Sequence, residues 1–180
     1  MNQILKSIRN IILFGLLYFL LKRYADVFTA SIKITISYAL AFIFFVSVIH
    51  GPIIGAGAAA LGTLIYQTVT NTFDWMIISC MAADCIFIGF FMSYLNIREG
   101  FFEKKDAVNF NNFQLLSHTI CWIIFYPLLV YFILQEPLLE TMMNGFFEVL
   151  GYYISCLIIT TLLLDIYAQT RISEANFYRK

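Results

Sequence analysis

Long apolar runs separated by short polar breaks dominate this sequence of 180 residues. Hydrophobic side chains make up 61% of it, charged side chains 12%, and the mean hydropathy is +0.83. A helix needs roughly 20 apolar residues to cross a bilayer, and its backbone groups must be bonded within the segment. The runs therefore predict an all-α integral membrane protein with six transmembrane helices and no separate soluble domain.

Turn-forming residues mark the expected ends of these helices. The triplet HGP at residues 50–52 predicts a sharp turn, because proline cannot supply a helix-interior hydrogen bond and disfavours helix before it. The segment NTFD at residues 71–74 is a second break. We treat residues 1–180 as a single membrane domain and expect helices over residues 4–24, 32–49, 53–69, 75–95, 107–134 and 144–168.

The distribution of basic residues predicts the orientation of the chain. With the N and C termini both cytoplasmic, eight of the 11 Lys and Arg residues are inside, while Lys22, Arg23 and Lys33 are outside. Cytoplasmic loops of membrane proteins carry an excess of basic residues, which favours this orientation. Residues 22–33, 70–74 and 135–143 then share the external face, where a ligand arriving from outside meets them.

Motifs of the common enzyme classes are absent from the sequence. It contains no G-x-x-x-x-G-K-[ST] loop, no G-x-S-x-G and no H-E-x-x-H. The four cysteines lie in apolar runs without C-x-x-C spacing, which indicates buried thiols rather than a disulfide framework or a zinc site. We therefore predict no enzyme activity, no cofactor and no metal.

A stretch of small residues, HGPIIGAGAAALG at residues 50–62, stands out in a chain rich in Phe and Tyr. On a helix Gly51, Gly55, Ala59 and Gly62 share one face, and such faces let helix backbones approach closely in lipid. Two interpretations remain open. The face packs within the protein's own bundle, or it forms a subunit interface on which another smooth surface slides.

Ionisable residues inside the apolar runs need a structural or functional explanation, because a charge at mid-bilayer costs about 2.5–3.5 kcal/mol. Asp84 lies near the middle of its run, and His118 lies in the next one. One interpretation is that Asp84 pairs with His118 or a neighbouring hydroxyl and fastens the bundle. The other is a proton relay through Asp84 and His118.

Aromatic and polar residues gather at similar depth near the external loops. Small-molecule sites combine apolar and aromatic walls with a few placed polar groups, whereas Tyr and Trp also form belts at membrane interfaces. A binding pocket and an aromatic belt are both consistent with this pattern. The candidate substrate-binding residues are Gln67, Asn71, Trp75, Asn144, Glu148 and Tyr152.

Three stretches resemble motifs of a known family. HGPIIGAGAAALG is similar to a helix opening F-G-P-hydrophobic-hydrophobic-G, with Gly51, Pro52 and Gly55 in register. DAVNFNNFQLLSHTICW, residues 106–122, is similar to the pattern D-x-x-x-F-N-x-x-Q-L-L followed by Trp. TLLLDIYAQTR, residues 161–171, is similar to a helix ending T-L-L-L, Y-A, Q-T-R. The family is the S components of energy-coupling factor (ECF) vitamin transporters, in particular the riboflavin-type branch.

The resemblance implies a substrate-capturing subunit with six helices and cytoplasmic termini in a bacterial cell membrane. It implies docking on an ECF transmembrane coupling subunit and a pair of cytoplasmic ATPases, and toppling within the membrane to carry a vitamin-like substrate inward. The family's first helix usually shows an A-x-x-x-A docking face, for which this chain offers Gly15 as the one small residue of FGLLYFLL. The substrate stays open among riboflavin, a pyrimidine, a pterin and a corrinoid.

Two other functions fit the same sequence. One is a structural or accessory membrane subunit that binds no ligand, which the divergent first and third helices permit. The other is a stand-alone ion-coupled transporter that uses Asp84 and His118 as its relay. The short chain without two inverted halves disfavours the second.

Overall fold

The computed structural model describes residues 3–29, 34–93, 97 and 100–177, and these form a helical bundle with one short β-ribbon. The elements in chain order are α1 (Gln3–Tyr24), β1 (Val27–Thr29), β2 (Ile34–Ile36), α2 (Tyr38–His50), α3 (Pro52–Thr70), α4 (Trp75–Phe91), α5 (Lys104–His118), the π-helix η2 (Thr119–Phe125), α6 (Tyr126–Leu134), α7 (Leu138–Ser155), the π-helix η3 (Cys156–Thr160) and α8 (Thr161–Phe177).

Four of the described helices are long and apolar enough to cross a membrane. They are Gln3–Tyr24, Pro52–Thr70, Lys104–Leu134, which joins α5, η2 and α6, and Leu138–Arg171, within α7, η3 and α8. Two shorter apolar helices, α2 and α4, complete the bundle. The helix predicted over residues 75–95 ends at Phe91, while residues 94–95 lie outside the described residues.

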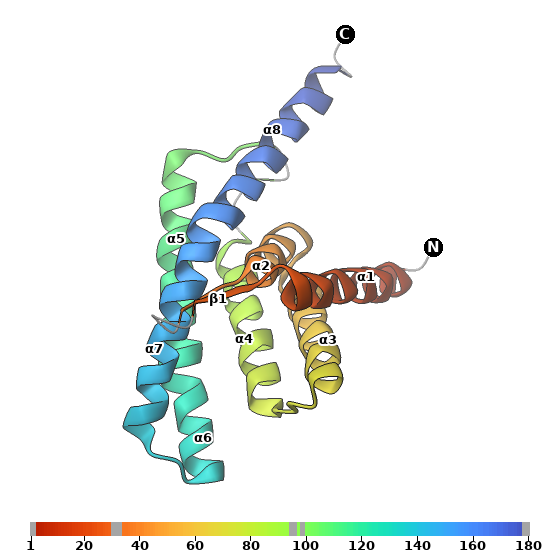
Figure 1. Ribbon diagram of the computed structural model, residues 1–180. Helices are drawn as coiled ribbons and strands as arrows, with labels where there is room; N and C mark the ends of the chain where they lie inside the picture. The colour runs from red at the N-terminus through yellow and green to blue at the C-terminus, as the bar shows by residue number, and fades with distance from the viewer. Residues whose placement is uncertain (1–2, 30–33, 94–96, 98–99, 178–180) are drawn as a thin grey trace.

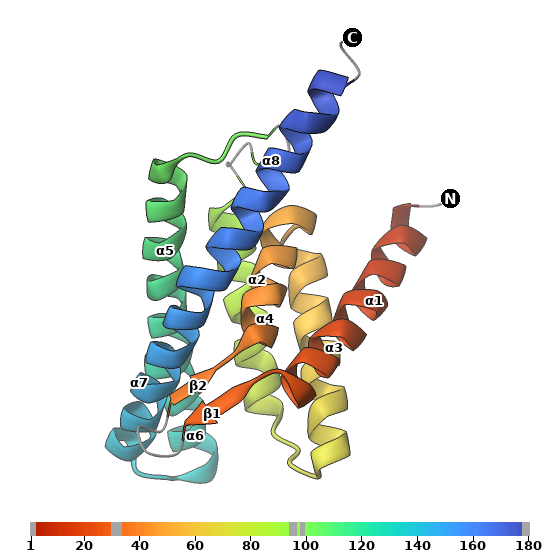
Figure 2. The same cartoon turned by 45° about the horizontal axis from the view of Figure 1, so that its top comes forward.

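The bundle has two parts that share the core (Figure 1). The two long rods, α5–η2–α6 and α7–η3–α8, lie side by side, and α1 to α4 form the other part, in which α1 packs on α3 and α3 packs on α4. The described beginning of α1 and end of α8 lie away from the α3–α4 and α6–α7 connections (Figure 2). One end of the bundle therefore carries the described start of α1 and end of α8, and the other carries these two connections.

The start of the second predicted helix is wrong. Of the helix expected over residues 32–49, residues 32–33 lie outside the described residues, residues 34–36 are β2, and α2 begins only at Tyr38. The β-branched segment Ile34–Ile36 pairs antiparallel with Val27–Thr29, as such residues favour a pleated surface. Ser37 then caps α2 by accepting a hydrogen bond from the Leu40 amide at 3.1 Å.

The two long rods begin earlier than their apolar patterns suggest. α5 begins at Lys104 rather than at residue 107, because Glu103 and Asp106 form a capping box that satisfies amides of the first turn. α7 begins at Leu138, directly after Pro137, rather than at residue 144. Polar residues such as Glu140 interrupt the apolar pattern there, so that pattern did not predict the start of α7.

The small-residue face of α3 is covered by the chain itself. A Cβ at Gly55 would collide with Ser47 of α2, and a Cβ at Gly62 would collide with Tyr18 and with the Gly15 carbonyl of α1. Ala59 has no exposed surface. This is the first of the two predicted interpretations, packing within the bundle, and a docking surface here would require α1 and α2 to leave α3.

The two remaining glycines proposed for a subunit interface also have local roles. Gly15 lies against Leu61 and the Ala58 carbonyl of α3, with its ideal Cβ 3.0 Å from Leu61 Cδ2. Gly51 has φ 98° and links α2 to α3, a left-handed conformation that glycine adopts without steric cost. These local roles explain the two glycines within the bundle, and their docking role stays a prediction.

Candidate functional site

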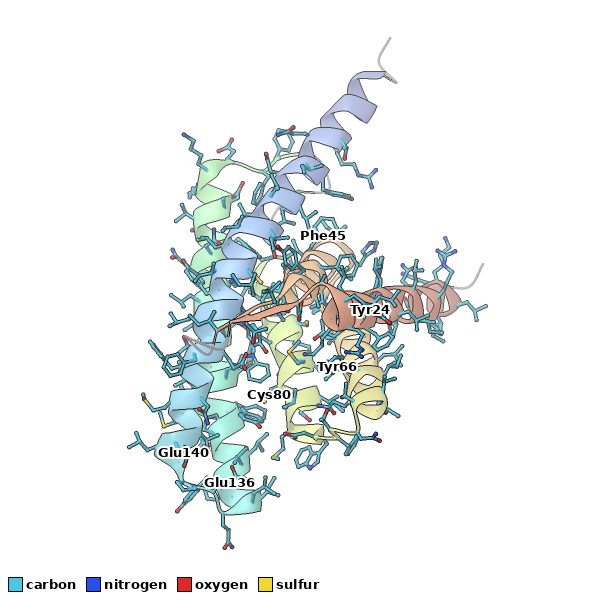
Figure 3. The ribbon with its side chains drawn as sticks, in the orientation of Figure 1. Tyr24, Phe45, Tyr66, Cys80, Glu136 and Glu140 are labelled. Atoms are coloured by element: carbon cyan, nitrogen blue, oxygen red, sulfur yellow. The ribbon has the colours of Figure 1, made fainter. Side chains whose placement is uncertain are left out.

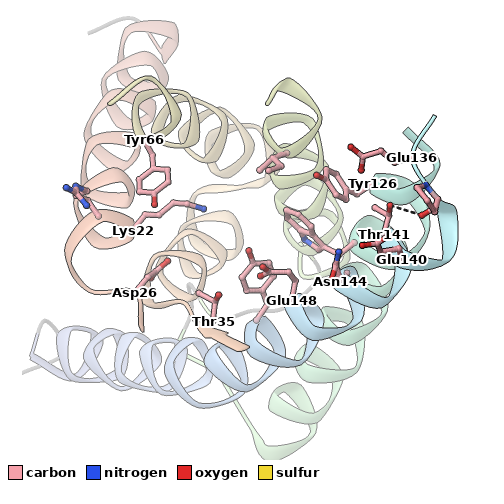
Figure 4. Close-up of a pocket in the computed structure, with 16 residues that line it drawn as sticks. Lys22, Asp26, Thr35, Tyr66, Tyr126, Glu136, Glu140, Thr141, Asn144 and Glu148 are labelled. Atoms are coloured by element: carbon pink, nitrogen blue, oxygen red, sulfur yellow. Dashed lines mark hydrogen bonds between the residues drawn. The ribbon is translucent and has the colours of Figure 1, made fainter. Parts of the chain in front are cut away.

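A cavity of about 850 Å³ opens near the end of the bundle that carries the α6–α7 connection (Figure 4). This volume falls within the range of small-molecule sites, roughly 300–1,000 Å³. Its walls come from the end of α1, the β-ribbon, α3, α4, η2, α6 and α7. The lining residues are Lys22, Arg23, Asp26, Thr35, Tyr66, Ile77, Trp122, Tyr126, Glu136, Pro137, Glu140, Thr141, Asn144, Gly145, Glu148 and Tyr152.

Three aromatic side chains form a contiguous wall of this cavity. The Trp122 ring meets the Tyr152 ring edge to face, with centroids 5.5 Å apart and planes at 71°. It also contacts Tyr126, with ring centroids 5.7 Å apart. Such pairs are favourable beyond the area they bury. Trp122 is therefore the centre of the wall, and a planar ligand would find aromatic surface there.

Charged groups face the cavity from separate elements. The Lys22 ammonium of α1 lies 5.3 Å from the Tyr66 ring centroid and 5.9 Å from that of Tyr18. On α7, Glu148 Oε2 is buried and has no hydrogen-bond partner among the described residues. Figure 3 places Glu136 and Glu140 at the α6–α7 end. A ligand with both donor and acceptor groups could meet partners on opposite walls.

Asp26 joins the cavity wall to the start of α2. Its carboxylate accepts hydrogen bonds from the Ser37 hydroxyl at 2.8 Å and from the Ala39 amide at 3.0 Å. Burial raises the pKa of Asp26 above its ordinary value, although both hydrogen bonds oppose that rise. The Ser37 amide in turn donates to Ser155 Oγ of α7 at 2.8 Å. These bonds fix the β-ribbon between α2 and α7.

Two glycines of α7 let the backbones of η2 and β2 pack closely against α7 beside the cavity. A Cβ at Gly145 would collide with the carbonyl oxygen of Trp122 in η2, and a Cβ at Gly151 would collide with the carbonyl oxygen of Thr35 in β2. Close helix packing through small residues is common in membrane bundles. α7 therefore holds both η2 and the β-ribbon at backbone contact.

A buried polar cluster lies behind the aromatic wall. His118 Nδ1 lies 2.6 Å from Asp84 Oδ2, and both side chains are fully buried. The Asp84 carboxylate also accepts hydrogen bonds from the Ser117 hydroxyl and, at 3.2 Å, from Trp122 Nε1. This confirms the predicted pairing of Asp84 with His118 and a hydroxyl, which joins α4 to the α5–η2 rod.

The cavity brings together half of the candidate binding residues. Asn144, Glu148 and Tyr152, all on α7, line it.

The other three candidates lie at the α3–α4 connection and do not line the cavity. Gln67 is buried, and its Oε1 accepts a hydrogen bond from the Asp74 amide at 3.1 Å. Asn71 is the left-handed C-cap of α3, with φ 54°, and the Trp75 side chain is 47% exposed. The prediction grouped these residues with those of α7 because of their similar depth, but depth does not determine which way a helix face points.

The sequence reasoning missed several of the lining residues. Trp122 and Tyr126 belong to the helix predicted over residues 107–134, and nothing in that pattern distinguished a cavity wall from ordinary core. Lys22 and Arg23 were counted only as loop charges. One available signal was Trp122, which closes the motif DAVNFNNFQLLSHTICW.

The fold and the cavity define a class of protein: a multi-pass membrane protein with a cavity of small-molecule size between its helices. The comparison with protein families is more specific. Residues 6–169 match the family described as "ECF-type riboflavin transporter, S component". The chain belongs to this family. It is therefore a membrane-integral, substrate-capturing transporter subunit rather than an enzyme.

Similar proteins span the whole chain. The UPF0397 protein of Lacticaseibacillus casei is 28% identical over 178 residues, which cover 97% of this chain and 96% of that protein. The UPF0397 protein of Lactobacillus johnsonii is 23% identical over 99% of this chain and 98% of its own length. A UPF0397 protein of Staphylococcus aureus is 26% identical over 97% of both chains. No solved structure matches the chain.

Proposed function

We propose that this subunit captures a vitamin or related micronutrient from outside the cell in the cavity described above. The observation that carries the proposal is the cavity itself, about 850 Å³ in volume and walled by the contacting rings of Trp122, Tyr126 and Tyr152. The polar groups of Lys22 and Glu148 are placed to orient the ligand. Burial of most of a ligand between such walls is typical of small-molecule sites.

In this proposal the chain crosses the membrane six times with both termini in the cytoplasm. Support comes from the excess of basic residues on the side of the termini. The described start of α1 and end of α8 also lie at the end of the bundle away from the α6–α7 connection, near which the cavity lies. The cavity then faces the outside, and substrate enters from there.

Family members work with an ECF transmembrane subunit and ATPase subunits. We infer one coupling subunit and two cytoplasmic ATPases as partners of this chain. The sequence contains no G-x-x-x-x-G-K-[ST] loop, so in this proposal the ATPase partners supply the energy for release. Binding must be tight in the outward-facing state and weak in the state that the ATPases favour.

A planar heteroaromatic ligand suits the aromatic wall best. Riboflavin appears in the description of the matched family and is our first candidate. Asn144, Glu148 and Tyr152 would contact it from α7, Trp122 and Tyr126 from the other rod, and Lys22 from α1.

The test combines native mass spectrometry of the protein purified in mild detergent with a riboflavin titration followed by flavin fluorescence. Capture is supported if a metabolite co-purifies with the protein and either is riboflavin or is displaced by it. A ligand-free protein that still co-purifies with ATPases indicates an accessory subunit. Uptake by the protein alone in liposomes under a pH gradient indicates an ion-coupled transporter.

Two neighbouring residues of α7 provide a matched pair of variants. Asn144 lines the cavity, whereas the adjacent Met143 is 53% exposed and does not. We expect Asn144→Trp to fill the cavity and abolish carry-over of the metabolite, while Met143→Trp retains it. Equal carry-over in both variants would place the ligand elsewhere.

A further inference from the structure

Asp84 is fully buried in α4, and its carboxylate is held by one neighbouring segment. The Ser117 hydroxyl bonds to Oδ1, and His118 Nδ1 and Trp122 Nε1 both bond to Oδ2. A carboxylate accepting several donors in a low-dielectric interior forms a strong and directional network. The side chains of Ser117, His118 and Trp122 are therefore all bonded to one buried carboxylate.

The network reaches the cavity although Asp84 does not line it. Trp122 carries the contact, since its Nε1 lies 3.2 Å from Asp84 while its ring lines the cavity. His118 provides a second path, with its ring 5.9 Å from that of Tyr152. Behind it, Phe44 stacks on His118 at 5.0 Å. Of the two rings bonded to the carboxylate, Trp122 is therefore part of the aromatic wall and His118 contacts it through Tyr152.

The backbone around Trp122 departs from a regular α-helix. Trp122 lies in the π-helix Thr119–Phe125, which starts immediately after His118. Pro127 follows, and a proline nitrogen offers no hydrogen bond to the preceding turn. π-Helical turns are rare and are often found at functional sites. The indole N–H bond to Asp84 adds a side-chain restraint where the backbone changes from α-helical to π-helical hydrogen bonding.

We propose that Asp84 is a positioning residue of the capture site: its carboxylate sets the orientation of the Trp122 ring, and through His118 that of Tyr152, so that the aromatic wall is formed before ligand arrives. This inference rests on the proposed capture function of the cavity. Preformed walls strengthen binding because the ligand does not have to order them.

The experiment uses the full-length protein carrying Trp75→Phe, which leaves Trp122 as the single tryptophan. Asp84→Asn keeps the size of the side chain but replaces one acceptor oxygen with a donor. Ser117→Ala is the matched control, because it removes a bond to the same carboxylate without touching Trp122. The readouts are Trp122 emission, acrylamide quenching without ligand, and the riboflavin Kd.

We expect Asp84→Asn to shift Trp122 emission to the red, increase its quenching and weaken riboflavin binding about tenfold, the size of one charge-assisted hydrogen bond. Ser117→Ala is expected to keep the emission of the parent. Unchanged emission in Asp84→Asn, or equal changes in both variants, overturns the proposal. If the parent itself fails to bind riboflavin, capture of that ligand fails, while the emission still decides whether Asp84 positions Trp122.

A measurement on the unaltered protein covers the case in which Asp84→Asn does not fold. In ¹⁵N-tryptophan spectra, the Trp122 indole proton should exchange with solvent far more slowly than that of the half-exposed Trp75. It should also resonate downfield, as expected for a proton bonded to a carboxylate. Equal exchange rates for the two indoles contradict the proposed tether.

Discussion

The backbone of Gly145 in α7 lies directly against the carbonyl oxygen of Trp122 in η2. No side chain fits between them, so the α7 wall and the aromatic wall of the cavity meet at this point. The contact involves backbone on both sides, and backbone cannot rotate away as a flexible side chain could. The distance between these two walls, and with it the width of the cavity, therefore depends on residue 145 having no Cβ atom.

Gly145→Ala should destabilise the protein by about 1–3 kcal/mol, the usual cost of overpacking, and should weaken ligand binding by moving α7. Thermal unfolding in detergent gives the first effect, and the riboflavin titration gives the second. The control is Gly57→Ala on α3, whose ideal Cβ lies 3.0 Å from the mobile tip of Ile11. A larger loss for Gly57→Ala than for Gly145→Ala would contradict this account.

Lys22→Met should weaken ligand binding about tenfold, because it removes the ammonium group that lies over the Tyr66 ring at the cavity wall. Methionine keeps most of the apolar stem, so packing changes little. Lys104→Met, at the exposed start of α5, removes the same charge away from the cavity and should leave the Kd unaltered. Equal losses in the two variants would point to a general effect of net charge.

Trp122→Ala should abolish most ligand binding, since stacking on an aromatic ring contributes about 1–3 kcal/mol per ligand ring. Trp75→Ala should bind as the parent does, because Trp75 is outside the lining and is 47% exposed. Titration of both variants with the metabolite identified by mass spectrometry checks the pair. If Trp75→Ala instead weakened binding more than Trp122→Ala, the ligand site would lie at the α3–α4 connection.

The pH dependence of stability should depend on Asp26. Its folded pKa is raised by burial above the ordinary value of 3.8, so the folded state binds the proton more tightly than the unfolded state. The stabilisation that follows is complete below the unfolded pKa and is lost as the pH rises through the folded pKa. Relative to the parent, Asp26→Asn should therefore gain thermal stability between about pH 4 and pH 7. A constant difference over this range would mean that the pKa of Asp26 is ordinary.

The family, the membrane location and most helices could be predicted from the sequence. Apolar runs determine where a chain can enter lipid, and Gly51-Pro52 determines where α2 gives way to α3, because both effects are local. The pairing of Asp84 with His118 was also predictable, since a buried carboxylate must find a donor. The β-ribbon was not, because residues 34–36 are apolar enough to continue a helix.

The sequence by itself determined what kind of surface each helix carries: a small-residue face on α3, a polar cluster at Asp84 and His118, and aromatic residues on η2 and α7. Only the tertiary structure decided which of these faces meet. Gly62 lies against Tyr18 of α1, and Trp122 rather than Trp75 is the tryptophan that lines the cavity. The physical reason is that composition and periodicity fix the depth of a residue in the membrane, whereas its direction depends on helix rotation, which is set by long-range contacts such as that of Gly145 with Trp122.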